Sequence, residues 1–204
     1  MTPRTFTALL AVGLLSACHS GPLGIAVPLN YQTMNPSYGP ADACEAASLA
    51  EFKDLRKNPS VIGERFEEDS PTKTAPVTAV GDAVDWYRSA FTSMARKSGL
   101  NVEQPGAPVL RIEIRELSAR EAVAFNSVYR VRMVLGAQVL PAGGGPACWS
   151  NSVEGEAKMY GRDASPENYA ETLNHAVERA SGALLDHPGM RQALCTCGGA
   201  RSGL

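Results

Sequence analysis

Between residues 109 and 160 the chain alternates apolar and polar positions in three successive segments, which cover about 110–115, 129–135 and 148–160. A period of two is the pattern of a strand with one buried face. The apolar members of the three series are Leu110, Ile112 and Ile114; Tyr129, Val131, Met133 and Leu135; and Trp149, Val153, Ala157 and Met159. The glycine run 143–145 between the second and third segments predicts a turn. Together the segments predict an antiparallel meander.

Two other segments repeat apolar residues every three or four positions, as amphipathic helices do. The first predicts a helix over about 76–98, with Pro76 in its first turn and Gly99 after its end. Its apolar stripe is Val77, Val80, Val84, Tyr87, Phe91 and Met94. The second begins at Ser165-Pro166-Glu167, an N-cap followed by a first-turn proline and an acid, and ends at 186–189.

The residues before the first helix carry weaker patterns. Residues 46–53 predict a strand, 54–63 the loop that leaves it, and the acidic stretch 64–69 a solvated segment. The order strand, helix, three strands, helix predicts an α/β fold, a two-layer sandwich in which two helices pack on one face of a mixed sheet. We place this domain at 44–187 and a Cys/Gly-rich tail at 188–204.

The N-terminus carries an export segment, in which Arg4 precedes a short apolar run that ends in Leu15-Ser16-Ala17-Cys18. These four residues resemble the lipobox of bacterial lipoproteins. The resemblance implies that residues 1–17 are removed and that Cys18 is acylated, which anchors the protein to a membrane of the cell envelope. No aspartate follows Cys18, which favours the periplasmic face of the outer membrane over the inner membrane. The alternatives are a plain signal peptide with a coincidental cysteine, and a buried N-terminal helix.

Residues 18–43 contain four prolines and predict a tether between the anchor and the domain. Within this tether, residues 24–29 predict an edge strand, because proline is tolerated at the margin of a sheet. Besides Cys18, the chain has Cys44, Cys148, Cys195 and Cys197, which predict disulfides in an exported protein. A mutual bridge between Cys195 and Cys197 would be strained, so each is expected to pair with a distant cysteine. A metal site or a redox-active thiol pair is the weaker alternative.

Composition and motifs exclude several classes of function. The 19 basic and 21 acidic side chains are dispersed, without the dense basic patch that nucleic-acid binding requires. The sequence contains no phosphate loop, dinucleotide fingerprint, nucleophile elbow or paired-histidine zinc motif. We therefore predict no catalytic residue, no metal and no cofactor. The outward positions of the predicted strands carry Arg111, Arg115, Arg130 and Arg132, a candidate partner-binding face. Alternatively, these arginines pair across strands with Glu113, Glu154 and Glu156.

Several short motifs resemble the YajG-type group of small bacterial lipoproteins. These are Asp54-Leu55-Arg56, then Val61-Ile62-Gly63, an amphipathic helix, and the strand Val109–Ile114, within a region that covers about 44–186. The resemblance implies an uncharacterised envelope lipoprotein, and similar sandwiches occur in accessory lipoproteins of transport systems and in cell-wall synthase activators. We expect a non-catalytic binding or assembly module whose partner is an envelope protein. The alternatives are a lipoprotein that binds a small ligand, lipid or glycan, and a thiol oxidoreductase.

Overall fold

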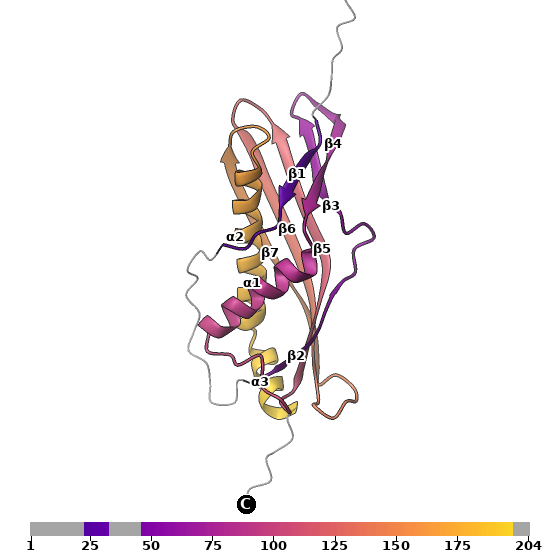
Figure 1. Ribbon diagram of the computed structural model, residues 1–204, viewed down its shortest axis with the longest axis vertical. Helices are drawn as coiled ribbons and strands as arrows, with labels where there is room; N and C mark the ends of the chain where they lie inside the picture. Colours follow the sequence, from indigo (N-terminus) through magenta and orange to yellow (C-terminus); the bar gives the residue numbers. More distant parts are fainter. Residues whose placement is uncertain (1–22, 33–45, 198–204) are drawn as a thin grey trace, which may run out of the picture.

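A single mixed sheet, covered on one face by helices, forms the framework of the protein (Figure 1). The computed structural model describes residues 23–32 and 46–197. The strands of these residues are β1 (Ile25–Pro28), β2 (Ser48–Asp54), β3 (Val61–Glu67), β4 (Ser70–Val80), β5 (Val109–Val123), β6 (Ser127–Leu140) and β7 (Trp149–Gly161). The helices are α1 (Ala83–Lys97), α2 (Pro166–Leu185) and α3 (Pro188–Cys197). The predicted α/β sandwich is confirmed, and β3, β4 and α3 are elements that the sequence patterns did not predict.

The strand order is β1-β4-β3-β5-β6-β7, and β2 also pairs with β5. Strands β2 and β3 share one edge of β5: β2 runs parallel to residues 109–114 and β3 runs parallel to residues 119–123. Strands β5, β6 and β7 form the predicted antiparallel meander. At the far margin, β1 pairs in parallel with β4, so the predicted edge strand in the tether is confirmed.

The core lies between the helices and the sheet. Helix α2 packs along β6 and β7 through its buried face, in which Tyr169, Leu173 and Val177 are almost fully excluded from solvent. Gly155 of β7 permits this approach, because a Cβ atom at that position would overlap the backbone of α2 at Ala176 and Ala180. On α1 the rings of Tyr87 and Phe91 pack against Phe52 of β2, with centroids 5.7 and 6.2 Å apart respectively.

The first third of the helix predicted at 76–98 is wrong. Residues 76–80 belong to β4, and α1 begins at Ala83 after an Asp82 N-cap, whose carboxylate accepts hydrogen bonds from the amides of Val84 and Asp85. Val77 is buried, but Val80 is 56 % exposed, so the two valines do not extend the buried stripe of the helix. Pairing with β1 and β3 selects a strand here, and Gly81, at φ +109°, separates the strand from the helix.

The interpretation of 54–63 as a loop and of 64–69 as a solvated acidic segment is only partly right: residues 55–60 do connect β2 to β3, and Glu68 and Asp69 are exposed. Residues 61–67 form β3, and Arg65 within it is only 3 % exposed. A shift in register between Val61 and Gly63 interrupts the alternation, which explains why the strand has no clean period of two. At the other end of the chain, residues 188–197, which we assigned to the tail, form α3 and pack against β6 and β7.

Candidate functional site

The face of β5, β6 and β7 opposite the helices is the candidate binding surface, and we call it the open face. These three strands are 13 to 15 residues long, and the helices of the described residues all pack on their other side (Figure 1). An antiparallel sheet with one uncovered face directs its polar side chains into solvent or toward a partner. The open face is therefore the surface on which the chain can display a long, preformed array of charges.

Three of the four predicted face arginines have carboxylate partners. The closest atoms of Arg111 and Glu51 are 2.9 Å apart, and those of Arg115 and Glu113 are 3.1 Å apart. Arg132 contacts Glu116 and Glu154 at 2.8 Å each and Glu156 at 3.4 Å. The hydrogen bond to Glu154 and the charge of Glu116 raise the pKa of Arg132 above its ordinary value. Exposed pairs of this kind contribute little to stability, and they neutralise most of the array.

Arg130 is the exception, because no hydrogen bond or ion pair joins it to a carboxylate within residues 23–32 and 46–197. It lies directly opposite Arg120 of β5 on one side and Lys158 of β7 on the other. We call these three residues the basic row. Arg120 pairs with Glu64 at 3.1 Å and lies over the Phe66 ring, while Lys158 lies 4.8 Å from the centre of the Tyr160 ring. The row thus has three cations and, at one end, a single carboxylate.

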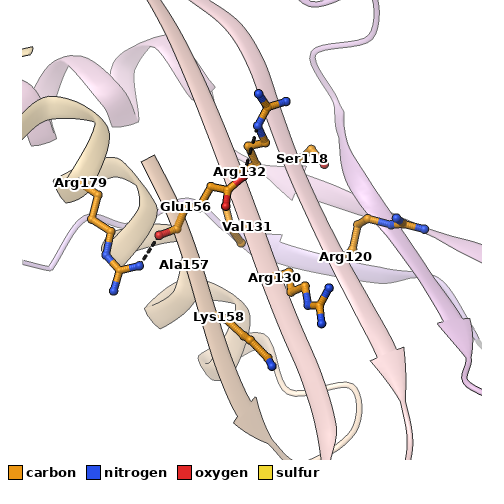
Figure 2. A pocket seen from close by; sticks show the side chains of 9 residues that line it. All are labelled: Ser118, Arg120, Arg130, Val131, Arg132, Glu156, Ala157, Lys158 and Arg179. Atoms are coloured by element: carbon orange, nitrogen blue, oxygen red, sulfur yellow. Dashed lines mark hydrogen bonds and ion pairs between the residues drawn. The ribbon is translucent and has the colours of Figure 1, made fainter. Parts of the chain in front are cut away.

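Like charges directly opposite each other on adjacent strands destabilise a sheet, by up to about 1 kcal/mol per pair. The basic row contains two such pairs, so fold stability does not account for it. The row also lines a hollow of about 470 Å³ on the open face (Figure 2). Its other charged or hydroxyl-bearing lining residues are Ser118, Arg132, Glu156 and Arg179. Arg179 reaches around β7 from α2 and donates a hydrogen bond to the Glu156 carbonyl oxygen.

The sequence patterns singled out Arg130 but missed the other two members of the row. Arg120 lies beyond the predicted end of its strand, because a bulge between Ile114 and Glu116 shifts the alternation by one residue. The renewed alternation of Leu117, Ala119 and Glu121 was the available indication that the strand continues. The alternation of the third segment puts Lys158 opposite in direction to the apolar Ala157 and Met159, but its position opposite Arg130 follows only from the strand register.

A second charged cluster is buried beneath the sheet, where β3 and β5 meet the start of α2. The Arg65 Nε atom donates to Glu121 Oε2 at 2.5 Å, and Arg65 also donates to Asp163 and, at 2.5 Å, to the Leu23 carbonyl oxygen. Glu121 accepts two more hydrogen bonds, each 2.9 Å long, from the Ala164 amide and the Tyr169 hydroxyl. Every member is satisfied by its neighbours, so the cluster joins the segment just before β1 to β3, β5 and α2.

The pKa values in this cluster follow from burial and hydrogen bonding. Burial raises the pKa of Glu121, but the hydrogen bonds from Ala164, Arg65 and Tyr169 outweigh it and hold that pKa below its usual value of 4.5. Burial, followed by the charge of Glu121, raises the pKa of Tyr169 far above its usual value. Glu121 is thus an ionised acceptor and Tyr169 a neutral donor, and both act as structural groups.

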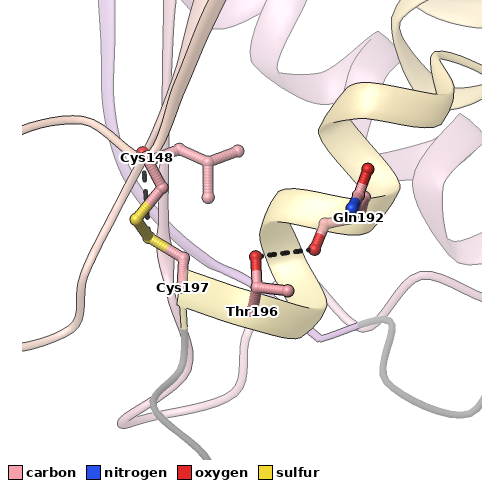
Figure 3. Close-up of a disulfide and its surroundings, with 5 residues drawn as sticks. Cys148, Gln192, Thr196 and Cys197 are labelled. Carbon is pink, nitrogen blue, oxygen red and sulfur yellow. Dashed lines mark hydrogen bonds between the residues drawn. A yellow bond between two sulfur atoms is a disulfide. The ribbon is translucent and has the colours of Figure 1, made fainter.

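The cysteines join the C-terminal helix to the sheet. Cys197 of α3 forms a disulfide with Cys148, the residue that precedes β7 (Figure 3). Cys195 is disulfide-bonded as well, so Cys195 and Cys197 are not bonded to each other. Cys44, which we expected to pair with one of them, lies outside the described residues, as do Cys18 and the rest of the lipobox. This arrangement fixes α3 and leaves the Cys-Thr-Cys segment without a dithiol couple.

Within residues 23–32 and 46–197, no group of three or more His, Cys, Asp or Glu side chains is arranged to hold a metal ion. None of the helices in these ranges combines the length and the apolar character needed to cross a bilayer. Among the described residues of the open face, the basic row is the group of cations with the fewest carboxylate partners.

No protein-family model and no curated protein matches this sequence. Solved structures do match. Protein XCC0632 from Xanthomonas campestris, of the family DUF330, aligns with a TM-score of 0.53 at 12 % identity, over 82 % of this chain and 96 % of that one. The two proteins share a fold. A candidate lipoprotein from Caulobacter crescentus CB15 aligns with a TM-score of 0.35 at 16 % identity, over 56 % of this chain and 82 % of its own.

Proposed function

We propose that this protein is a lipid-anchored, non-catalytic binding module of the bacterial cell envelope, and that its open face binds an acidic segment of an envelope protein. The Leu15–Cys18 lipobox supports the anchor, and the absence of an aspartate after Cys18 favours the periplasmic face of the outer membrane. The YajG-type motifs and the fold shared with XCC0632 are compatible with this proposal.

The observation that carries the binding role is the basic row. Arg130 and Lys158 are exposed and have no carboxylate partner among the described residues, and the sheet holds them side by side with Arg120. Adjacent strands are about 4.8 Å apart, so the row spans about 10 Å and matches two neighbouring carboxylates. An acidic partner would relieve the repulsion within the row, and charge complementarity of this kind gives specificity and fast association.

The anchor is tested by Cys18→Ser in cells that process lipoproteins. We expect this variant to lose fatty-acid labelling and to move almost completely from the membrane fraction to the soluble envelope fraction, because the substitution removes the Cys18 sulfur that the lipobox marks for acylation. Fractionation with wild type as the control measures the effect. A variant that stays with the membrane in high salt would contradict a purely lipid attachment.

The binding face is tested by the double variant Arg130→Glu/Lys158→Glu, with a photoreactive residue placed at Ser118 in the hollow. We expect wild type to form a defined crosslink to one envelope protein, and the double variant to lose at least nine-tenths of it. The thermal midpoint of the variant should stay close to that of wild type, because the change at residue 130 turns its pair with Arg120 into one of opposite charges, which offsets the like-charge pair that persists between residues 130 and 158.

Lys57→Glu/Lys97→Glu provides a matched control with the same change of charge, because both lysines are exposed and lie outside β5, β6 and β7, in the β2–β3 connection and at the end of α1. This control should crosslink as wild type does. Equal crosslinking by both double variants would refute the binding role of the row. Loss of the protein crosslink together with retention of a co-purified glycan or lipid would favour the small-ligand alternative.

A further inference from the structure

We infer that the end of the domain formed by the β5–β6 turn docks into the membrane interface, with Phe125 inserted among the lipids. This inference rests on the lipid anchor at Cys18 proposed above. It adds an orientation. The β5–β6 turn contacts the membrane, the strands run away from the membrane surface, and the open face is accessible to a partner from the side.

The covalent chain keeps this end close to the anchor. Leu23 is the first described residue, and its carbonyl oxygen is held by the buried Arg65 guanidinium at 2.5 Å. Arg65 is in register with Glu121, only four residues before Phe125. Cys18 precedes Leu23 by five residues, which span at most about 18 Å when fully extended. The anchor therefore lies within about 18 Å of Leu23, which is beside the part of β5 that leads into the β5–β6 turn.

Exposed apolar side chains gather at the same end. Phe125, in the turn, is as exposed as a free side chain, at 107 %, and Leu23 and Tyr160 are 77 % and 58 % exposed. Tyr160 is in register with Val128, just after the turn. Figure 1 shows the β5–β6 turn and the beginning of β1 at the same, upper end of the molecule. Aromatic side chains are preferred at membrane interfaces, where the ring is buried and a polar tip stays hydrated.

Charge at this end points to apolar docking and not to electrostatic docking. The neighbouring β3–β4 turn carries the exposed acids Glu68 and Asp69, and the Glu68 amide donates to the Val123 carbonyl oxygen. Anionic headgroups would be repelled by these two carboxylates. The contact is therefore expected with zwitterionic lipid as well as with anionic lipid, and it should be insensitive to salt.

The experiment uses the full lipidated protein, reconstituted into vesicles whose phosphatidylcholine carries bromine atoms on the acyl chains. Phe125→Trp reports contact with the acyl region through quenching of its fluorescence, and Leu55→Trp, at an exposed position in the β2–β3 connection, is the matched control. Trp86, which is buried, and Trp149, at the opposite end of β7, contribute a common background. We expect the quenching of Phe125→Trp to exceed that of Leu55→Trp several-fold, and to be unchanged when phosphatidylglycerol is added.

Equal quenching of the two variants in membrane-bound protein would overturn the docking and leave the anchor intact. Quenching that requires phosphatidylglycerol and disappears in Arg130→Glu/Lys158→Glu would also overturn it, and would make the basic row a headgroup site. If neither variant cosediments with the vesicles, the proposed anchor itself fails, and the docking fails with it.

Discussion

Glu121→Gln is expected to destabilise the fold by about 3–5 kcal/mol, the cost of removing one partner of a buried ion pair. The Arg65 guanidinium is 3 % exposed and donates to the carboxylate that this variant neutralises, so its charge would remain buried without its principal partner. Urea unfolding measures the loss. Glu154→Gln is the control, since this carboxylate also contacts an arginine but its side chain is 57 % exposed. That variant should stay within about 1 kcal/mol of wild type.

The same carboxylate makes stability depend on pH. The pKa of Glu121 is lowered in the folded protein, so its contribution is fully present above its ordinary value of 4.5. The contribution is lost as the pH falls through the lower, folded value. Wild type should therefore lose stability below about pH 4.5 more steeply than Glu121→Gln does. Parallel curves for the two proteins would show that Glu121 is not ionised in the fold. Replacing Arg65 and Glu121 together by Met should recover much of the loss, because an apolar pair leaves no uncompensated charge.

Gly63→Ala is expected to destabilise the fold toward the upper end of the about 1–3 kcal/mol range for overpacking. A Cβ atom at residue 63 would overlap the carbonyl group and the nitrogen of Ala119, where β3 pairs with β5. Backbone in the middle of a sheet cannot move aside as a flexible side chain would. The thermal midpoint measures this effect, and Gly143→Ala is the control because a Cβ there would meet nothing within 4 Å. If Gly63→Ala has the same thermal midpoint as Gly143→Ala, the close approach of β3 to β5 at Ala119 is contradicted.

These positions explain the motifs that resemble the YajG-type group. Asp54 and Arg56 form an ion pair at 2.6 Å with both side chains less than 10 % exposed, and Arg56 also donates to the Pro59 carbonyl oxygen at 2.9 Å. The pair lies in the connection between β2 and β3, two strands that pair one after the other with the same edge of β5. Gly63 then allows β3 to approach β5. The motifs are therefore accounted for by the structure of this edge of the sheet.

Elements whose patterns are local were predictable. The β5–β7 meander alternates along each strand, and α2 carries its Ser165 cap and a first-turn proline within three residues. Elements that depend on distant partners were not. The stripe through Val77 and Val80 fits a helix, and only the pairing of β4 with β1 and β3 decides for a strand. Arg65 lies in an acidic, polar stretch, and only Glu121, 56 residues later, makes its burial tolerable.

The candidate site divides in the same way. Local sequence determined that Arg111, Arg115, Arg130 and Arg132 share the outward face of a sheet, and it supplied the lipobox on which the proposed anchor depends. Strand register and a bulge decided which of these cations are neutralised and brought Arg120 and Lys158 beside Arg130. The physical reason is the separation along the sequence over which each effect acts. Periodicity and capping act within a few residues, whereas the compensation of a charge depends on neighbours that chain folding brings from other strands.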